Sequence, residues 1–339
     1  MITNTSFTES WINTLKKANS QANINPPLFE KMIYALLLAE LLKVNGLDFI
    51  FKGGTSLILL LDKPQRFSID IDIVTQANQK TIEAVLEKVC TDSRFTHFEL
   101  DNKRSYREGV PKAHYKLYFS PIFNQDNKIL LDILFDENPY PQTQEVDIAQ
   151  NWIETHPPLT KVTIPTIESI TGDKLTAFAP NTVGIRYGQG KQSEIIKQMF
   201  DLGQLFNKVR DFEVVTTSFM KNAEKELSYR GELAGKSTDD VIEDILETCF
   251  DVVMEKQPEL QHGLKIFGSW TIYPFRRNEA IETAGKIAYM ISKIKKSDTT
   301  PLLHFDSSTM KTNDFLIQEP QYNFLNKKVK NANDALFYW

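Results

Sequence analysis

The chain of 339 residues has few features that would place it in a membrane or outside the cell. It contains only two cysteines, Cys90 and Cys249, which are far apart and lack the short spacing of metal ligands. Neither a disulfide framework nor a zinc site is therefore expected. No apolar stretch is long enough to cross a bilayer, and residues 1–25 are too polar for a secretory signal. We expect a cytoplasmic protein with no membrane partner.

Positive charge is not in excess either. The net charge is −5 at pH 7, which argues against broad, sequence-independent binding to nucleic acid. It does not exclude a local basic groove, because the basic residues gather at two places. These are Lys103, Arg104, Arg107, Lys112 and Lys116, and then Lys293, Lys295 and Lys296. Each group is interpreted either as a solvated surface or as a contact with RNA.

Histidine is also scarce, and its spacing is not that of a metal site. The five residues are His97, His114, His156, His262 and His304. We interpret them as structural or surface residues. The sequence also shows no internal repeat and no low-complexity tract.

The segment Lys52-Gly53-Gly54-Thr55-Ser56-Leu57 carries the first chemical signal. A short apolar run, Leu47 to Phe51, leads into the two glycines, and a sequence typical of a helix start follows. The glycines are therefore predicted at a strand-to-helix turn. Glycine lets backbone N–H groups approach a phosphate closely, so this turn is a candidate phosphate site.

A second signal follows between residues 68 and 74. Three isoleucines alternate there with Asp70 and Asp72, which is strand periodicity and places both carboxylates on one face. Neighbouring carboxylates repel each other, and a bound divalent cation removes the conflict. Mg²⁺ takes oxygen ligands and keeps positions for water and substrate phosphates. The pair therefore predicts a metal site beside the glycine turn.

A third carboxylate, Asp132, completes the predicted site. It is the lone charge within the apolar strand pattern of residues 128–135, where it would support a two-metal arrangement. Asp132 could instead cap a helix or a turn.

Three regions follow from the rest of the pattern, and the fold class is expected to be α+β. An N-terminal helical segment occupies residues 1–46, with its helix at 29–44. A mixed core spans residues 47–165, with a helix at 80–90 and strands at 114–119 and 128–135. Prolines mark the passage to a mainly helical domain, residues 166–339. Its clearest helices are predicted at 193–206, 239–254 and 278–295.

With these motifs the chain resembles the AbiEii-like nucleotidyltransferases. This family is a branch of the polymerase-beta-like superfamily and includes toxins of bacterial toxin–antitoxin and phage-defence systems. The order and rough spacing of the motifs hold from about Phe29 to Phe206. The matching residues are Phe51-Lys52-Gly53-Gly54-Thr55-Ser56-Leu57, Arg66-Phe67-Ser68, Asp70-Ile71-Asp72, Asp132, Thr166-Ile167-Glu168-Ser169-Ile170, Lys174-Leu175-Thr176-Ala177-Phe178 and Lys197-Gln198-Met199-Phe200-Asp201-Leu202.

The resemblance implies a polymerase-beta-like nucleotidyltransferase core followed by a C-terminal helical domain. It also implies that Lys174 neutralises charge on the leaving pyrophosphate and that Asp201 is an active-site acid. From spacing alone, Asp201 would instead form a surface ion pair with Lys197, four residues earlier. The chain departs from the family pattern at Ile69, at Gln198 and at Ile58-Leu59, where the family has a polar Ser-Lys. Other basic residues could take over the triphosphate contacts of that missing lysine, namely Lys52, Lys63 or Arg66.

Our interpretation is a metal-dependent nucleotidyltransferase. Asp70, Asp72 and Asp132 would bind Mg²⁺, with Mn²⁺ as an alternative, and Asp132 would help to activate an acceptor hydroxyl. The triphosphate of the NTP substrate would be held by Gly53, Gly54, Thr55, Ser56, Arg66 and Lys174. The resemblance implies an RNA acceptor, such as a tRNA end, and a separate antitoxin protein as partner.

Three alternatives stay open. The acceptor could be a protein or a small molecule rather than RNA. The run Asp70-Ile71-Asp72-Ile73-Val74 also fits the aspartate nucleophile of a haloacid-dehalogenase-like phosphatase, although that strand should open the fold. The protein could also be a binding module without catalysis.

Two further expectations concern a loop and the C-terminal residues. Residues 184–190 are rich in glycine and predict a flexible loop, from which Arg186 or Lys191 would close over substrate. The apolar C-terminal residues 334–339 are expected to dock on the protein's own fold.

Overall fold

The chain folds into two compact units. The computed structural model describes residues 1–18, 23–61, 63, 65–91, 93–105, 110–123, 127–332 and 334–339. The first unit comprises Met1–Asn138, Thr143–Thr166 and Trp270–Tyr273, and the second comprises Pro139–Gln142, Ile167–Ser269 and Pro274–Trp339. Each unit has its own cluster of buried apolar side chains.

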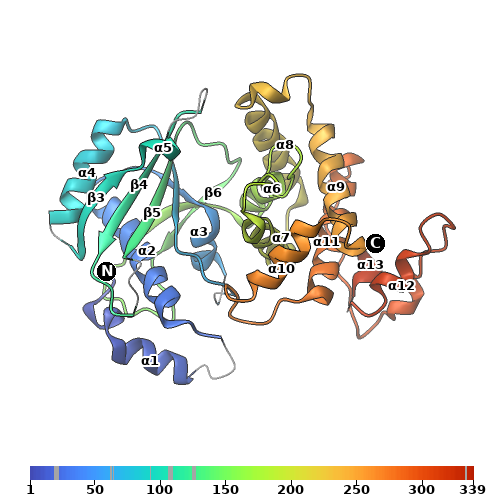
Figure 1. Cartoon of the computed structure of the whole chain (residues 1–339), viewed down its shortest axis with the longest axis horizontal. Helices are drawn as coiled ribbons and strands as arrows, with labels where there is room; N and C mark the ends of the chain where they lie inside the picture. Colours follow the sequence, from blue (N-terminus) through green and yellow to red (C-terminus); the bar gives the residue numbers. More distant parts are fainter. Residues whose placement is uncertain are drawn as a thin grey trace. The chain divides into compact units, whose positions relative to one another are not determined.

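A mixed seven-stranded sheet forms the centre of the first unit (Figure 1). The strands are β1 Ile50–Lys52, β2 Ile71–Thr75, β3 Phe95–Leu100, β4 Lys112–Phe119, β5 Lys128–Phe135, β6 Thr143–Asp147 and β7 Lys161–Pro165. Their order across the sheet is β3-β4-β5-β2-β1-β7-β6. The pairs β2–β5 and β1–β7 are parallel, and the other neighbours are antiparallel. The predicted strands at 114–119 and 128–135 are confirmed.

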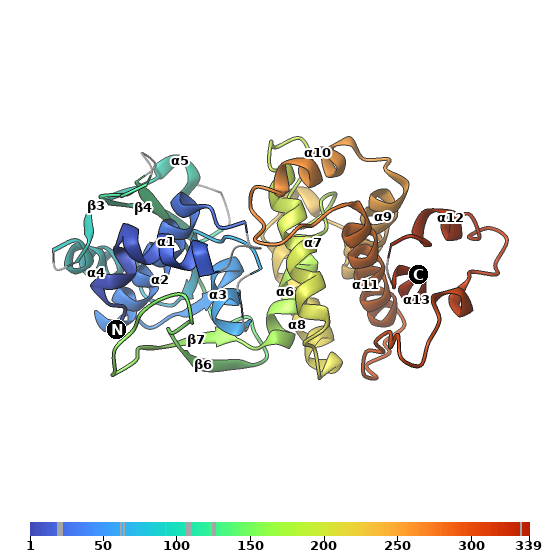
Figure 2. The same ribbon diagram turned by 90° about the horizontal axis from the view of Figure 1, so that it is seen from below.

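The first unit also contains helices, two of which, α2 and α4, pack their apolar side chains against one face of the sheet (Figures 1 and 2). The elements are η1 Asn4–Phe7, α1 Glu9–Ala18, α2 Pro26–Val44, α3 Gly53–Leu60, α4 Gln79–Thr91 and α5 Asn102–Ser105. Helix α2 contacts β2, β5 and β7 and is buried on nearly all sides, which explains its unusually apolar sequence. Two of its acids are buried with backbone N–H partners: Glu30 accepts from Ile122 and Phe123, and Glu40 accepts from Ile2.

The burial pattern of β5 distinguishes the two faces of the sheet. In β5 the side chains of Ile129, Leu131 and Ile133 are fully buried in the cluster that contains α2, whereas Asp132 between them is half-buried. Side chains alternate along a strand, so Asp132 points to the opposite, open face. The sequence pattern thus separates a packed face from a face that can carry chemistry.

The second unit is helical. Its elements are α6 Ile167–Ala177, α7 Gln192–Phe206, α8 Phe212–Ser228, η2 Gly231–Leu233, α9 Thr238–Met254, α10 Pro258–Phe267, α11 Arg277–Lys295, η3 Thr312–Phe315, α12 Leu325–Val329 and α13 Ala335–Tyr338. The three helices predicted in this region are confirmed as α7, α9 and α11, each beginning one residue earlier than expected. With the mixed sheet of the first unit, they confirm the α+β fold class.

The C-terminal residues dock on α11, as expected. The indole Nε1 of Trp339 donates to the carbonyl oxygen of Ile281, at 3.4 Å. Gly285 makes this approach possible, because a Cβ atom at that position would lie 2.7 Å from Trp339 Nε1. The end of the chain is therefore part of the core of the second unit.

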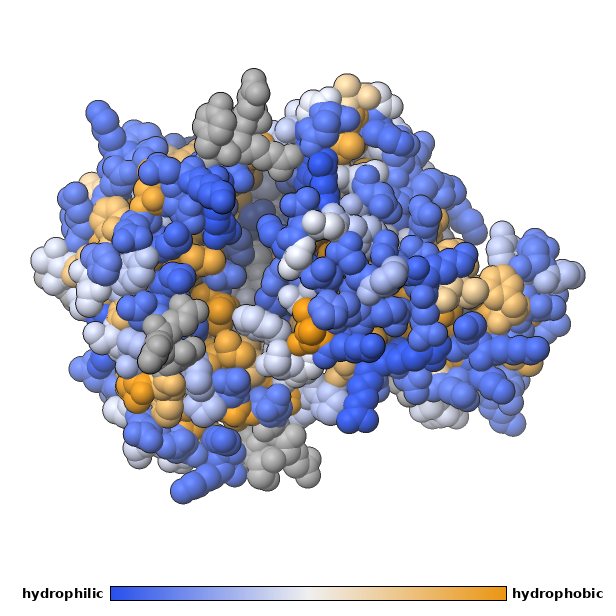
Figure 3. Space-filling model, viewed as in Figure 1, coloured by the Kyte–Doolittle hydropathy of each residue, from blue (hydrophilic) through white to orange (hydrophobic). Residues whose placement is uncertain are grey.

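No helix in the described ranges combines the length and the apolar character needed to cross a bilayer. On the face shown in Figure 3, hydrophilic residues predominate, and hydrophobic residues are exposed in small, separate groups.

Close contact between α6 and α8 gives a stability prediction. A Cβ atom at Gly172 would lie 2.5 Å from the backbone nitrogen of Phe219 and 2.7 Å from the carbonyl oxygen of Val215. Gly172→Ala must push the two helices apart, and overpacking of this kind typically costs about 1–3 kcal/mol. Gly268→Ala is the matched control, because nothing lies within 4 Å of its Cβ position. Thermal unfolding should show a lower Tm for Gly172→Ala alone; equal Tm values would contradict this packing.

Candidate active site

The two glycines after β1 form the predicted strand-to-helix turn. Strand β1 ends at Lys52 and α3 begins at Gly53, whose φ of 77° favours glycine. A Cβ atom at Gly53 would lie 2.1 Å from Asp72 Oδ2, and one at Gly54 would lie 2.4 Å from Arg66 Nη2. The glycines therefore leave the space that the Asp72 carboxylate and the Arg66 guanidinium occupy.

Hydroxyl groups fix this turn to the segment that carries the first aspartate. Thr55 Oγ1 donates to the carbonyl oxygen of Asp70, at 2.5 Å, and lies 2.9 Å from Ser68 Oγ. Ser56 Oγ donates to the carbonyl oxygen of Gly53, at 2.9 Å. Thr55 and Ser56 are fully buried, so both hydroxyls serve the geometry of the turn. A phosphate at this turn would meet the backbone N–H groups of α3, whose first turn has no side-chain cap.

Arg66 lies under the same turn. It is buried, and its Nη1 donates to the carbonyl oxygen of Phe67, at 2.9 Å. Its backbone forms a bridge with Thr271, in the short later segment that belongs to the first unit. The guanidinium therefore has a fixed position beside Gly54.

Strand pairing brings two of the predicted metal ligands side by side. Asp72 on β2 and Asp132 on β5 are register partners in a parallel pair, so their side chains leave the same face of the sheet. Asp70 lies two residues before Asp72, one residue before β2 begins, whereas the sequence placed it inside the strand. All three residues are half-buried. Their side chains do not converge as a ready-made set, since the described residues contain no group of three or more carboxylate, imidazole or thiol side chains poised for a metal.

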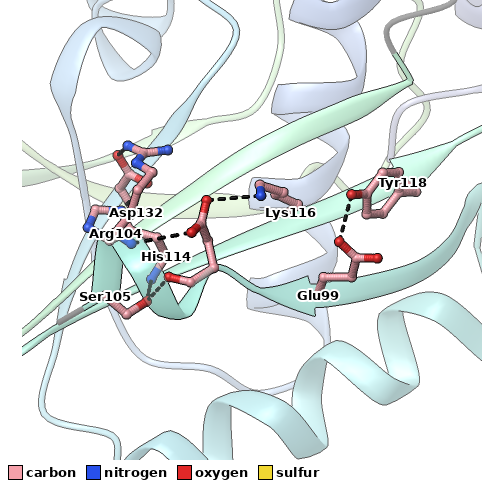
Figure 4. Close-up of polar contacts among 8 residues, drawn as sticks. Glu99, Arg104, Ser105, His114, Lys116, Tyr118 and Asp132 are labelled. Atoms are coloured by element: carbon pink, nitrogen blue, oxygen red, sulfur yellow. Dashed lines mark hydrogen bonds and ion pairs between the residues drawn. The ribbon is translucent and has the colours of Figure 1, made fainter.

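Asp132 is held by two neighbours instead (Figure 4). Its Oδ1 lies 2.6 Å from Nδ1 of His114, which is its register partner on β4. Its Oδ2 accepts a hydrogen bond from Arg104 Nη2, at 3.0 Å. From sequence we interpret His114 only as a structural or surface residue. The predicted strand at 114–119 places His114 on a strand. The register of β4 against β5, which sets His114 beside Asp132, is not visible in that pattern.

The short helix α5 brings Arg104 to this place. Ser105 Oγ accepts from the backbone N–H of His114, at 2.9 Å, and Asp101 forms an ion pair with Lys116, at 2.9 Å (Figure 4). The hydrogen bond from Lys116 also holds the pKa of the Asp101 carboxyl below its usual value. Helix α5 is therefore fastened to β4 at both of its ends.

These contacts also describe the two basic groups. In the first, Arg104 and Lys116 bind carboxylates, and Arg107 lies outside the described residues. In the second, Lys293 is buried and forms an ion pair with Asp298, at 2.6 Å. Several members of the two groups therefore serve the fold.

In the second unit, Lys174 on α6 and Asp201 on α7 form a buried ion pair. Lys174 Nζ lies 2.7 Å from Asp201 Oδ2, and only about 5% of either side chain is exposed. Lys174 Nζ also donates to Gln198 Oε1, at 3.0 Å. Lys197, the partner suggested by spacing alone, pairs with Glu194 at 2.8 Å.

The glycine-rich segment at 184–190 is anchored to its neighbours. Arg186 pairs with Glu232, at 2.6 Å, and the N–H of Gly188 donates to Glu259, at 2.7 Å. Asn181 and Thr182, which lie just before this segment, donate hydrogen bonds to the Asp244 carboxylate. Burial raises the pKa of the Asp244 carboxyl, and these hydrogen bonds oppose the shift.

Comparisons with known proteins agree with this fold. The sequence profile of the family described as "Nucleotidyl transferase AbiEii toxin, Type IV TA system" matches residues 36–266. Among solved structures, the nucleotidyltransferase toxin MenT4 of Mycobacterium tuberculosis superimposes with a TM-score of 0.51 at 12% identity, covering 97% of this chain and 98% of that one. A putative nucleotidyltransferase from H. pylori has a TM-score of 0.43 at 15% identity, covering 81% and 96%. No curated protein sequence matches significantly.

The buried pair predicts opposite results for single and double substitutions. Lys174→Met leaves Asp201 charged and buried, which typically costs about 3–5 kcal/mol, whereas replacing both members by apolar residues is often neutral or stabilising. We therefore expect Lys174→Met to lower the free energy of unfolding and Lys174→Met/Asp201→Leu to recover it. Urea unfolding followed by circular dichroism measures both.

Lys236→Met is the matched control for that experiment. Lys236 pairs with Asp240 at 2.8 Å, but its side chain is 49% exposed, so its loss should cost less than about 1 kcal/mol. Equal losses in Lys174→Met and Lys236→Met would show that burial does not govern the Lys174 pair.

Proposed function

The chain belongs to the AbiEii nucleotidyl transferase toxin family and is a nucleotidyltransferase, and we propose that it transfers a nucleoside monophosphate from an NTP to RNA with the help of a divalent metal. The observation that carries the proposal is the register of β2 and β5. It sets Asp72 beside Asp132 on the open face of the sheet, next to the glycine turn.

In this proposal the three carboxylates bind the metal. Hard divalent cations prefer oxygen ligands, and Asp70, Asp72 and Asp132 offer them at the start of β2 and on the neighbouring strand. Bound metal in such sites lowers the pKa of the attacking hydroxyl and stabilises the leaving pyrophosphate. Mg²⁺ is the expected ion, and Mn²⁺ is the alternative. Asp132 would also help to take the proton from the acceptor hydroxyl.

The glycine turn would hold the triphosphate. The uncapped N–H groups at the start of α3, from Gly53 and Gly54 onward, carry partial positive charge and suit an anion. Thr55 and Ser56 would act by shaping the turn, and the Arg66 guanidinium beside Gly54 adds positive charge beneath it. The sequence resemblance assigns Lys174 to neutralising the pyrophosphate, and its buried ion pair with Asp201 would hold the side chain in a fixed position.

The partners proposed are an RNA acceptor, such as a tRNA end, and an antitoxin protein. The antitoxin follows from the family, which is described as part of a type IV toxin–antitoxin system. The RNA acceptor is supported by the sequence resemblance. The phosphatase alternative is not supported by the fold, because β2 follows β1 and α3 and pairs antiparallel with β1 instead of opening the fold.

A transfer assay tests the function. Purified protein is incubated with Mg²⁺, total cellular RNA and each of the four α-labelled nucleotides. We expect labelled RNA with at least one nucleotide, no label after EDTA treatment, and a loss of about 100-fold or more for Asp70→Ala, Asp72→Ala and Asp132→Ala, since even outer-shell partners of metal ligands contribute about 10- to 100-fold.

Other results would redirect the proposal. Label in a protein or a small molecule instead of RNA would change the acceptor class. No label in any fraction would favour a binding module without catalysis. Unchanged transfer by all three aspartate variants would contradict the proposed metal site.

Gly53→Ala tests the glycine turn. Its Cβ atom would collide with the Asp72 carboxylate, and its φ of 77° is strained for alanine by about 1–2 kcal/mol. Gly46→Ala is the matched control, because φ is 86° there but nothing lies within 4 Å of its Cβ position. Both variants should lose stability in thermal unfolding, Gly53→Ala more than Gly46→Ala because the collision adds to the shared strain, and only Gly53→Ala should lose transfer activity. Equal activity in the two variants would be inconsistent with the role of this turn.

A further inference from the structure

We propose that the two oxygens of Asp132 have different tasks: His114 holds Oδ1 permanently as a positioning residue, while Arg104 and the divalent ion exchange on Oδ2. This inference rests on the proposed function, in which Asp132 is a metal ligand. Neither His114 nor Arg104 was singled out as a site residue by the sequence motifs.

His114 is held in a fixed position. It is 9% exposed and lies opposite Asp132 in the β4–β5 register, so strand pairing fixes the imidazole against Oδ1. An ionised carboxylate only accepts hydrogen bonds, so Nδ1 carries the hydrogen and donates it at 2.6 Å. The other ring nitrogen, Nε2, is buried and has no hydrogen-bond partner in the described part of the chain. The polar contact that the structure gives this ring is therefore directed to Asp132.

Such contacts matter at metal sites. Carboxylate ligands are themselves hydrogen-bonded by outer residues, which fix their orientation, and loss of these partners typically weakens metal binding by about 10- to 100-fold. By holding Oδ1, His114 leaves Oδ2 as the oxygen of Asp132 that can accept a cation in exchange for Arg104.

Arg104, by contrast, is placed so that its side chain can leave Oδ2 of Asp132. Its side chain is 40% exposed, and it extends from the four-residue helix α5 to Oδ2 at 3.0 Å. The backbone of α5 is fastened by Ser105 and Asp101, so the guanidinium can swing away without moving the helix. Exposed ion pairs of this kind are weak and easily replaced.

Charge explains why the exchange would occur. Asp72 and Asp132 are neighbours across the strand pair, and their repulsion requires positive charge nearby. Arg104 brings a single charge, to Oδ2 of Asp132. A divalent ion brings two charges and can contact both carboxylates, so it should displace the guanidinium from Oδ2. His114, on the opposite oxygen, does not compete.

Removing the two neighbours should therefore have opposite effects on metal affinity. The measurement is the dissociation constant of Mn²⁺ for the purified full-length protein, from the electron paramagnetic resonance signal of free Mn²⁺. His114→Phe keeps a buried ring but has no donor, and His114→Asn keeps a donor close to the position of Nδ1. We expect His114→Phe to weaken Mn²⁺ binding by about 10- to 100-fold and His114→Asn to restore it largely. Arg104→Gln should tighten binding several-fold, since it removes a competing cation.

The controls separate this inference from the proposed function. Circular dichroism verifies that each variant is folded, and Asp132→Asn is the reference that should bind Mn²⁺ weakly. Equal binding by His114→Phe and His114→Asn, or weaker binding by Arg104→Gln, would overturn the inference while Asp132→Asn still shows that Asp132 is a ligand. Unchanged binding by Asp132→Asn would overturn both the metal role of Asp132 and this inference.

Discussion

The parallel pairing of β2 with β5 is the constraint on which the site depends. It fixes two carboxylates, Asp72 and Asp132, as neighbours on the same face of a sheet, where their repulsion has to be balanced by positive charge. The structure meets this demand from both sides of the pair. His114 and Arg104 bind Asp132, and Lys52 is the register partner of Asp72 on β1. A row of polar residues thus crosses four adjacent strands at one level of the sheet.

Packing on the other face of the sheet fixes the positions of these two carboxylates. Helix α2 is buried almost completely, and the apolar residues of β5 that alternate with Asp132 lie in the same cluster. Moving β5 by one residue would turn Asp132 into this core and the apolar residues out, so the register is strongly specified. The glycine turn adds a second restriction, because only a residue without a side chain leaves room for Asp72 beside Gly53. The face that carries the proposed site is therefore determined by apolar packing on the opposite face and by the glycine turn.

Sequence reasoning predicted what depends on local pattern. Alternation placed Asp72 and Asp132 on strands, two glycines predicted the turn, and long apolar periodicity predicted the helices of the second unit, including α7. It failed where contacts join distant segments. The antiparallel register that brings His114 to Asp132 has no signature in either strand alone, and the ion pair of Lys174 with Asp201 depends on how α6 packs against α7.

The central claim is that Asp72 and Asp132 share a divalent cation. The most direct measurement is a crystal structure of the full chain grown with Mn²⁺, with an anomalous difference map recorded at the manganese absorption edge. The account predicts a manganese peak in contact with both Asp72 and Asp132, with His114 still bound to Asp132 and Arg104 moved away. A well-ordered site without such a peak, or manganese bound only to carboxylates elsewhere, would contradict it.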